Sequence, residues 1–199
     1  MIVKRIFDIV FSLLGLVMLC PLIVLVSIAI KIDSPGHIFF RQVRVGRFGK
    51  PFLIHKFRTM RDTSEMEGLK ITVNGDKRIT AVGKYLRRYK IDEIAQLFDV
   101  LRGEMSLVGP RPEVPEFVAA YPAEAKNVVL SIRPGITDNA SIKFRNENYI
   151  LATSSDPTGC YINEVLPVKI KYYLDYVEVR SFFGDILIII RTVGVIFKL

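Results

Sequence analysis

The residues of this 199-residue chain best suited to chemistry are two adjacent carboxylates that follow a cluster of cations. Asp92 and Glu93 come directly after the segment 87–90 (RRYK), and Arg111 lies between two prolines in the segment 109–112 (GPRP). Arginines bind and orient phosphate oxygens. One carboxylate can attack phosphorus, and a second can hold Mg²⁺ against a diphosphate. The pattern therefore suits phosphoryl transfer.

The acidic pair also has a purely structural interpretation. Asp92 could cap the N-terminus of a helix, and Glu93 would then be favourable in the first turn. Arg88, four residues before Asp92, could form a surface ion pair with it. These local features alone leave the catalytic and the structural interpretations open.

Other kinds of site find no support in the sequence. It contains none of the usual phosphate-loop, dinucleotide-binding, zinc-protease or serine-hydrolase motifs. Cys20 and Cys160 form no CxxC pair, and His37 and His55 lack the spacing of metal ligands. The chain is therefore compatible with a reducing compartment and predicts neither a disulfide framework nor a zinc site.

Positive charge is concentrated in one part of the chain. The formal net charge is +8, and residues 31–111 contain 17 Lys and Arg against 9 Asp and Glu, whereas residues 112–199 contain 9 against 10. Such a segment suits anionic lipid headgroups, phosphates, or both. Nucleic acid is the rival anion, which composition alone does not exclude.

The N-terminus contains an uncharged apolar segment, residues 9–30. As a helix it would be about 33 Å long, enough to cross a bilayer. Pro21 interrupts helical hydrogen bonding near its middle, and Lys4, Arg5 and Lys31 would keep both ends in the cytoplasm. These features favour a re-entrant element that breaks at residues 20–21 over a spanning helix, although spanning helices also tolerate proline.

The rest of the sequence predicts a mostly helical α+β domain. Short strands are expected at 38–40 and 51–57, followed by a polar loop at 61–76. Helices are expected over 80–88, from Asp92 to Gly103, and over 115–130, 165–179 and 182–199. The last is apolar almost all round, and two placements stay open for it, in the membrane interface or packed on the N-terminal helix. A turn at 133–135 precedes a polar, poorly periodic stretch that reaches residue 159.

Three segments of the chain resemble a known family: 56–60 (KFRTM), 91–112 (IDEIAQLFDVLRGEMSLVGPRP) and 133–137 (RPGIT). They closely resemble the bacterial sugar transferases called monotopic phosphoglycosyl transferases, and the resemblance covers nearly the whole chain. It implies a re-entrant membrane helix-break-helix in residues 1–33, with a proline at the break. Residues 34–199 would then form a small cytoplasmic catalytic domain with short strands and amphipathic interfacial helices.

The resemblance also implies an activity. Family members transfer a sugar-1-phosphate from a UDP-sugar to polyprenyl (undecaprenyl) phosphate and release UMP, at the first membrane step of a surface or protein-linked glycan. Asp92 corresponds to the nucleophile that carries a covalent phosphosugar, and Glu93 to the residue that binds Mg²⁺ and handles protons. The expected location is the cytoplasmic face of the bacterial inner membrane, with membrane lipids as further partners and no nucleic acid. Whether the chain forms a homodimer stays open.

Six cations are the substrate-binding candidates that the resemblance implies: Lys56, Arg58, Arg87, Arg111, Arg133 and Arg145. Of these, Lys56, Arg87 and Arg111 correspond to the phosphate-contacting residues of the family. The chain departs from the family pattern at residues 138–142 (DNASI), where many members have Gly-Leu-Ala-Gln, and at Cys20, where serine is common. The first departure bears on contacts to the sugar and the base.

Two other functions compete with this one. A membrane-anchored binding module would use the basic segment to hold anionic lipid or nucleic acid, and its binding would tolerate loss of Asp92. A direct glycosyltransferase would release UDP instead of UMP. The nucleotide product therefore discriminates between the two transferases.

Overall fold

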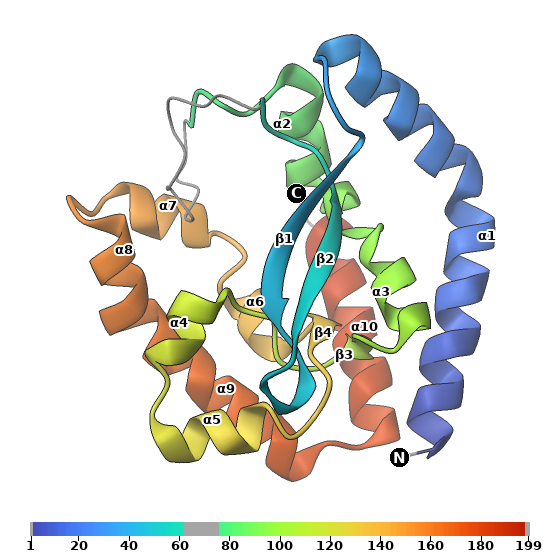
Figure 1. Cartoon of the computed structure of the whole chain (residues 1–199). Helices are drawn as coiled ribbons and strands as arrows, with labels where there is room; N and C mark the ends of the chain where they lie inside the picture. The colour runs from blue at the N-terminus through green and yellow to red at the C-terminus, as the bar shows by residue number, and fades with distance from the viewer. Residues whose placement is uncertain (1, 62–75, 198–199) are drawn as a thin grey trace.

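The computed structural model describes residues 2–61 and 76–197 and has a mostly helical α+β fold, as the sequence predicts. A β-hairpin runs through the middle, and the long helix α1 flanks it on one side (Figure 1). Most of the polar loop predicted at 61–76 lies outside the described residues. The elements in chain order are α1 (Ile2–Asp33), β1 (Phe39–Val45), η1 (Arg47–Gly49), β2 (Pro51–Phe57), α2 (Ala81–Arg88), η3 (Ile91–Glu93), α3 (Gln96–Arg102), β3 (Ser106–Val108), α4 (Pro115–Ala119), α5 (Ala123–Val129), β4 (Gly135–Thr137), α6 (Asn139–Lys143), α7 (Glu147–Ala152), α8 (Pro157–Cys160), η4 (Tyr161–Val165), α9 (Leu166–Val179) and α10 (Phe182–Phe197).

Helix α1 contains the whole apolar segment 9–30 and passes through Pro21 without an interruption. The helix bends along its length (Figure 1). A proline removes one helical hydrogen bond and clashes with the turn before it, which a bend can absorb. The predicted break at residues 20–21 is therefore wrong, because one helix continues through Pro21. Among the described helices, α1 alone is long and apolar enough to cross a bilayer, judged by length and composition.

Both ends of α1 are attached to the same domain. Near its N-terminus, the Arg5 guanidinium donates to the Val100 carbonyl oxygen at the end of α3 (2.8 Å). At its C-terminus, the Asp33 carboxylate accepts from the Val82 amide at the start of α2 (3.0 Å). Between these anchors the helix exposes apolar side chains such as Val17 and Met18. The exposed apolar surface therefore lies between two polar attachments.

Strands β1 and β2 form an antiparallel hairpin. The predicted bounds of β2 are confirmed, whereas β1 extends beyond the predicted 38–40 to Val45, through residues too polar to suggest a strand. Along β2, Phe52, Ile54 and Lys56 share one face because side chains alternate. Phe52 and Ile54 are buried in a cluster with Val100 of α3. The strand that packs on α3 thus brings Lys56 toward the segment before α3.

Strands β3 and β4 form a second, parallel sheet that the sequence does not predict. Each has three residues, too few for a periodic pattern. The backbones of the two segments approach so closely that a Cβ at Gly135 would lie 2.0 Å from the backbone nitrogen of Gly109. The Gly135 amide also donates to the Pro110 carbonyl oxygen (2.9 Å). This close packing and the hydrogen bond to Pro110 together fix the loop that carries Arg111.

Three helix predictions need correction. The helix expected from Asp92 begins at Gln96 instead, after the short 3₁₀ helix η3, and it ends at Gly103 as predicted, with φ at 87°. The helix expected over 115–130 is divided into α4 and α5, because Pro122 cannot donate a helical hydrogen bond. The polar stretch before residue 159 forms α6, α7 and α8, which are too short for a helical period to be visible.

Hydrophobic packing supports the positions of two candidate site residues. Val26 and Ile30 of α1 form a buried cluster with Phe57 of β2 and Leu86 of α2. Lys56 precedes Phe57, and Arg87 follows Leu86. The C-terminal half of α1 therefore supports both elements that carry these cations.

Candidate active site

The acidic pair lies on η3, between α2 and α3. Lys90, directly before it, has φ at 56° and turns the chain through the left-handed region. Asp92 and Glu93 are 7% and 8% exposed. The N-cap residue of α3 is Ala95, which forms no side-chain cap. The helix-cap and surface-pair interpretations of Asp92 are therefore wrong.

Glu93 is held by two cations from different elements. Lys56 Nζ of β2 donates to Glu93 Oε1 (2.9 Å). Arg111 contributes both ends of its guanidinium, with Nη2 2.6 Å from Oε1 and Nη1 3.3 Å from Oε2. Burial acts to raise the pKa of Glu93, but the charges of Arg111, Lys56 and Lys90 together hold that pKa well below its ordinary value. Glu93 is thus held in its ionised form at neutral pH.

Asp92 is in a different environment from its neighbour. Burial, and then the negative charge of Glu93, raise the pKa of Asp92, although the charges of Lys56, Lys90 and Arg87 oppose this shift. Its Oδ1 atom is buried and has no hydrogen-bond partner in the described part of the chain. A desolvated carboxylate oxygen without a partner is more nucleophilic than one held by donors. Of the two acids, Asp92 is therefore the one suited to attack.

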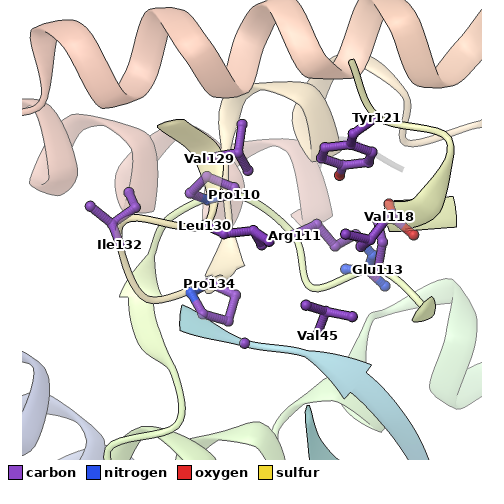
Figure 2. A pocket seen from close by; sticks show the side chains of 11 residues that line it. Val45, Pro110, Arg111, Glu113, Val118, Tyr121, Val129, Leu130, Ile132 and Pro134 are labelled. Carbon is purple, nitrogen blue, oxygen red and sulfur yellow. The ribbon is translucent and has the colours of Figure 1, made fainter. Parts of the chain in front are cut away.

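Arg111 projects from the loop between β3 and α4, beside a small and mostly apolar pocket. The residues that line this pocket include Val45, Pro110, Arg111, Tyr121 and Leu130 (Figure 2). The lining contains neither member of the acidic pair. Glu93 raises the pKa of Arg111 well above its ordinary value, so the guanidinium stays charged. The loop therefore presents a fixed positive charge to the acidic pair.

The structure brings together five of the predicted site residues: Asp92, Glu93, Lys56, Arg111 and, through its charge on Asp92, the half-buried Arg87.

The guanidinium groups of three other predicted cations donate to backbone oxygens away from the acidic pair. Buried Arg58 donates to the carbonyl oxygens of Ser34 (2.6 Å) and Pro35 (2.7 Å), where the chain leaves α1. Arg133 donates to the Gly103 carbonyl oxygen (2.7 Å), and exposed Arg145 to that of Val195 in α10 (3.2 Å). Their part in substrate binding stays a prediction.

Sequence reasoning missed two residues that contact the segments around the Arg111 loop. Arg44 of β1 donates to the Pro112 carbonyl oxygen (3.1 Å) and lies 3.8 Å from the Glu113 carboxylate. Asp8 of α1 is 2% exposed and accepts hydrogen bonds from β3. An acid just inside the apolar N-terminal helix was the signal that could have identified Asp8, because a charge there is costly unless it has a role.

The two carboxylates fit a magnesium ion that is bound together with a phosphate substrate. The described residues contain no group of three or more acidic, histidine or cysteine side chains that could enclose a metal. Mg²⁺, however, commonly uses one or two carboxylates, several waters and substrate phosphates. Glu93, an anion beside the unpartnered oxygen of Asp92, provides the oxygen ligand that such a site requires.

Comparison with known proteins gives consistent matches. The sequence model of the bacterial sugar transferase family matches residues 1–199. The chain is 35% identical over 196 residues (98% of this chain, 43% of the relative) to the UDP-N-acetylgalactosamine-undecaprenyl-phosphate N-acetylgalactosaminephosphotransferase of Aeromonas hydrophila. It is 36% identical over 201 residues (96% and 68%) to the UDP-glucose:undecaprenyl-phosphate glucose-1-phosphate transferase of Caulobacter vibrioides. It is 40% identical over 200 residues (97% and 35%) to the undecaprenyl-phosphate glucose phosphotransferase of Komagataeibacter xylinus. The chain thus spans 35% to 68% of the length of these relatives.

Proposed function

Because this chain belongs to the bacterial sugar transferase family, we propose that it transfers a sugar-1-phosphate from a UDP-sugar to undecaprenyl phosphate. The names of the three relatives support this substrate class, since all include undecaprenyl phosphate and two include a UDP-sugar. They differ in the sugar, which is glucose or N-acetylgalactosamine. The proposal therefore names UDP-sugars as the class of donor without choosing the sugar. It also includes a role in the first membrane step of a glycan pathway.

The observation that carries this proposal is the buried acidic pair, in which one carboxylate is held by cations and the other has an unpartnered oxygen. Asp92 attacks the sugar-bearing phosphorus of the donor. A bond forms from Asp92 to phosphorus, the bond to UMP breaks, and UMP leaves. An oxygen of the lipid phosphate then attacks the same phosphorus, which releases Asp92 and forms the lipid diphosphosugar.

The cations around Glu93 orient the donor. Lys56 and Arg111, which both contact Glu93, would bind the donor diphosphate so that Asp92 can reach its phosphorus. Glu93 would hold Mg²⁺, which supplies charge neutralisation for the departing phosphate when it is bound. Because Lys56 and Arg111 keep Glu93 ionised, it can serve as a ligand across the physiological pH range.

A donor screen tests the proposed function. Purified protein is incubated with undecaprenyl phosphate, Mg²⁺ and a panel of UDP-sugars, and the nucleotide products are separated. We expect UMP from at least one donor, together with a lipid diphosphosugar. Release of UDP would indicate direct glycosyl transfer, and absence of any product with the whole panel would reject both transferases.

We further propose that α1 enters the cytoplasmic leaflet of the bacterial inner membrane and returns. Its two ends are attached to one domain, and that domain must face the cytoplasm, where UDP-sugars are made. Carrying Lys4 and Arg5 across the membrane would also be unfavourable. The curvature of α1 and its exposed apolar middle fit this topology (Figure 1).

Labelling of a single cysteine tests this topology. Ile2 is 77% exposed, so Ile2→Cys in a Cys20→Ser, Cys160→Ser background should react readily with a thiol reagent that reaches it. With an impermeant reagent we expect protection in intact cells and labelling once the cells are opened. Labelling from outside intact cells would mean that α1 spans the membrane.

Lys56 predicts an alkaline limit to activity. Burial lowers the pKa of Lys56 to about 8, although Glu93 opposes the shift. As pH rises through that value, the free enzyme loses the charge that faces Glu93 and the donor, so kcat/KM for the UDP-sugar should fall about tenfold per pH unit. Lys56→Arg should move the fall to higher pH, because arginine stays protonated. A flat profile between pH 7 and 10 would contradict this role.

A further inference from the structure

Asp8 is a buried acid in the membrane helix, far in sequence from the acidic pair. It is 2% exposed, and it accepts from Ser106 Oγ (2.9 Å) at Oδ2 and from the Leu107 amide (3.2 Å) at Oδ1. A buried carboxylate is costly unless it is hydrogen-bonded. Both of its hydrogen bonds come from β3, so the carboxylate attaches α1 to this strand.

Strand β3 leads directly into the loop that carries Arg111. On the side of β4, the Ser106 amide donates to the Pro134 carbonyl oxygen (2.8 Å) and the Gly109 amide to that of Thr137 (3.1 Å). The Leu107 amide, which alternation turns to the other edge, meets Asp8. Asp8 therefore closes the edge of β3 that β4 leaves unpaired.

The end of β3 is held by side chains from three helices, α1, α9 and α10. The Val108 carbonyl oxygen accepts from Lys4 Nζ of α1 and from Tyr176 Oη of α9, both at 3.1 Å. Asp185 of α10 binds the same two groups, with Oδ2 2.5 Å from Lys4 Nζ and Oδ1 2.8 Å from Tyr176 Oη. Three residues after Val108, Arg111 holds Glu93. A displacement of β3 would therefore reach the acidic pair through Arg111.

We propose that Asp8 is a positioning residue that fixes the Arg111 loop, so that the seating of α1 is part of the assembly of the active site. This inference rests on the proposed function, in which Arg111 orients the donor phosphate. Asp8 acts through Arg111 and does not contact the substrate. Its loss should thus lower the rate of transfer and should have no effect of its own once Arg111 has been altered.

The kinetic test is a double-mutant cycle with a matched control. Asp8→Asn removes the charge and one acceptor, and Ser106→Ala removes one of the two bonds without changing the charge of α1. The control Asp175→Asn makes the same chemical change on the exposed face of α9. We expect Asp8→Asn to lower kcat about tenfold or more with KM for the UDP-sugar within about twofold, Ser106→Ala to lower kcat less, and Asp175→Asn to match the native protein.

Coupling to Arg111 separates positioning from a general structural role. In an Arg111→Lys background, Asp8→Asn should lower kcat by less than about twofold, because residues that act as a unit are not additive. Equal losses in both backgrounds would overturn the proposal, as would native kcat in Asp8→Asn.

Amide hydrogen exchange tests the inference without reference to activity. In Asp8→Asn, the peptide that spans residues 106–111 should exchange about fivefold faster or more, while the peptides of α9 stay unchanged. Unchanged exchange in that peptide, or a rise across the whole protein, would overturn the proposal. If the native protein releases no UMP, the proposed function fails, and the exchange result still decides whether Asp8 fixes the loop.

Discussion

Asp92→Asn should lower kcat by about a thousandfold or more, while the protein stays folded and membrane-bound. The amide has nearly the same size as the carboxylate, but it lacks the attacking anion. The measurement is UMP release under saturating UDP-sugar and undecaprenyl phosphate, with thermal unfolding followed in parallel. Removing a buried negative charge beside Glu93 also relieves repulsion, so the melting temperature should stay equal or rise.

The control for this substitution is Asp175→Asn, an identical change at an exposed position of α9, which should leave kcat unchanged. Full activity in Asp92→Asn would remove Asp92 from the mechanism. It would then favour a direct attack of the lipid phosphate on the donor, with the acidic pair serving only to bind cations.

Arg111→Lys should lower kcat about a hundredfold even though it keeps the positive charge. The arginine fork reaches both oxygens of Glu93, at 2.6 and 3.3 Å, and a single ammonium cannot reproduce this arrangement. Steady-state kinetics with the UDP-sugar should show the loss mainly in kcat, because a misplaced charge affects the transition state more than ground-state binding.

Arg191→Lys on the exposed side of α10 is the matched control, and it should be as active as the native protein. Native activity in Arg111→Lys would instead assign the loop between β3 and α4 a structural role. It would also remove the link through which Asp8 is proposed to act.

Much of this fold follows from local pattern in the sequence. The strand predicted over 51–57 matches β2, and the helix predicted over 80–88 matches α2 except that Thr80 is its N-cap, where its side chain accepts from the Gly83 amide (3.0 Å). Gly103 marks the end of α3 because it adopts a positive φ there. In these elements the residues that decide the structure lie within a few positions of one another.

The sequence could not predict the contacts that arrange the site. The short strands β3 and β4 pair across about thirty residues, and Lys90 reaches the left-handed region without being glycine. The pairing of Glu93 with Lys56 depends on how β2 packs on α3. Such contacts are set by tertiary packing, which leaves no periodic trace in the chain.

The roles of the six predicted cations illustrate the same limit. Lys56, Arg87 and Arg111 gather around the acidic pair, whereas Arg58 holds Ser34 and Arg133 holds Gly103. All six are basic residues that could bind phosphate as far as residue type is concerned. Only the direction in which each element presents its side chain separates those at the acidic pair from those bound elsewhere.

The most direct test of covalent transfer through Asp92 is the mass of the protein after a single half-reaction. Native protein is incubated with UDP-sugar and Mg²⁺ without a lipid acceptor, quenched and digested, and the peptide that contains Asp92 is analysed by mass spectrometry. The proposed mechanism predicts a phosphosugar adduct on Asp92 and about one UMP per protein molecule. An unmodified Asp92 peptide, with UMP appearing only after undecaprenyl phosphate is added, would contradict it.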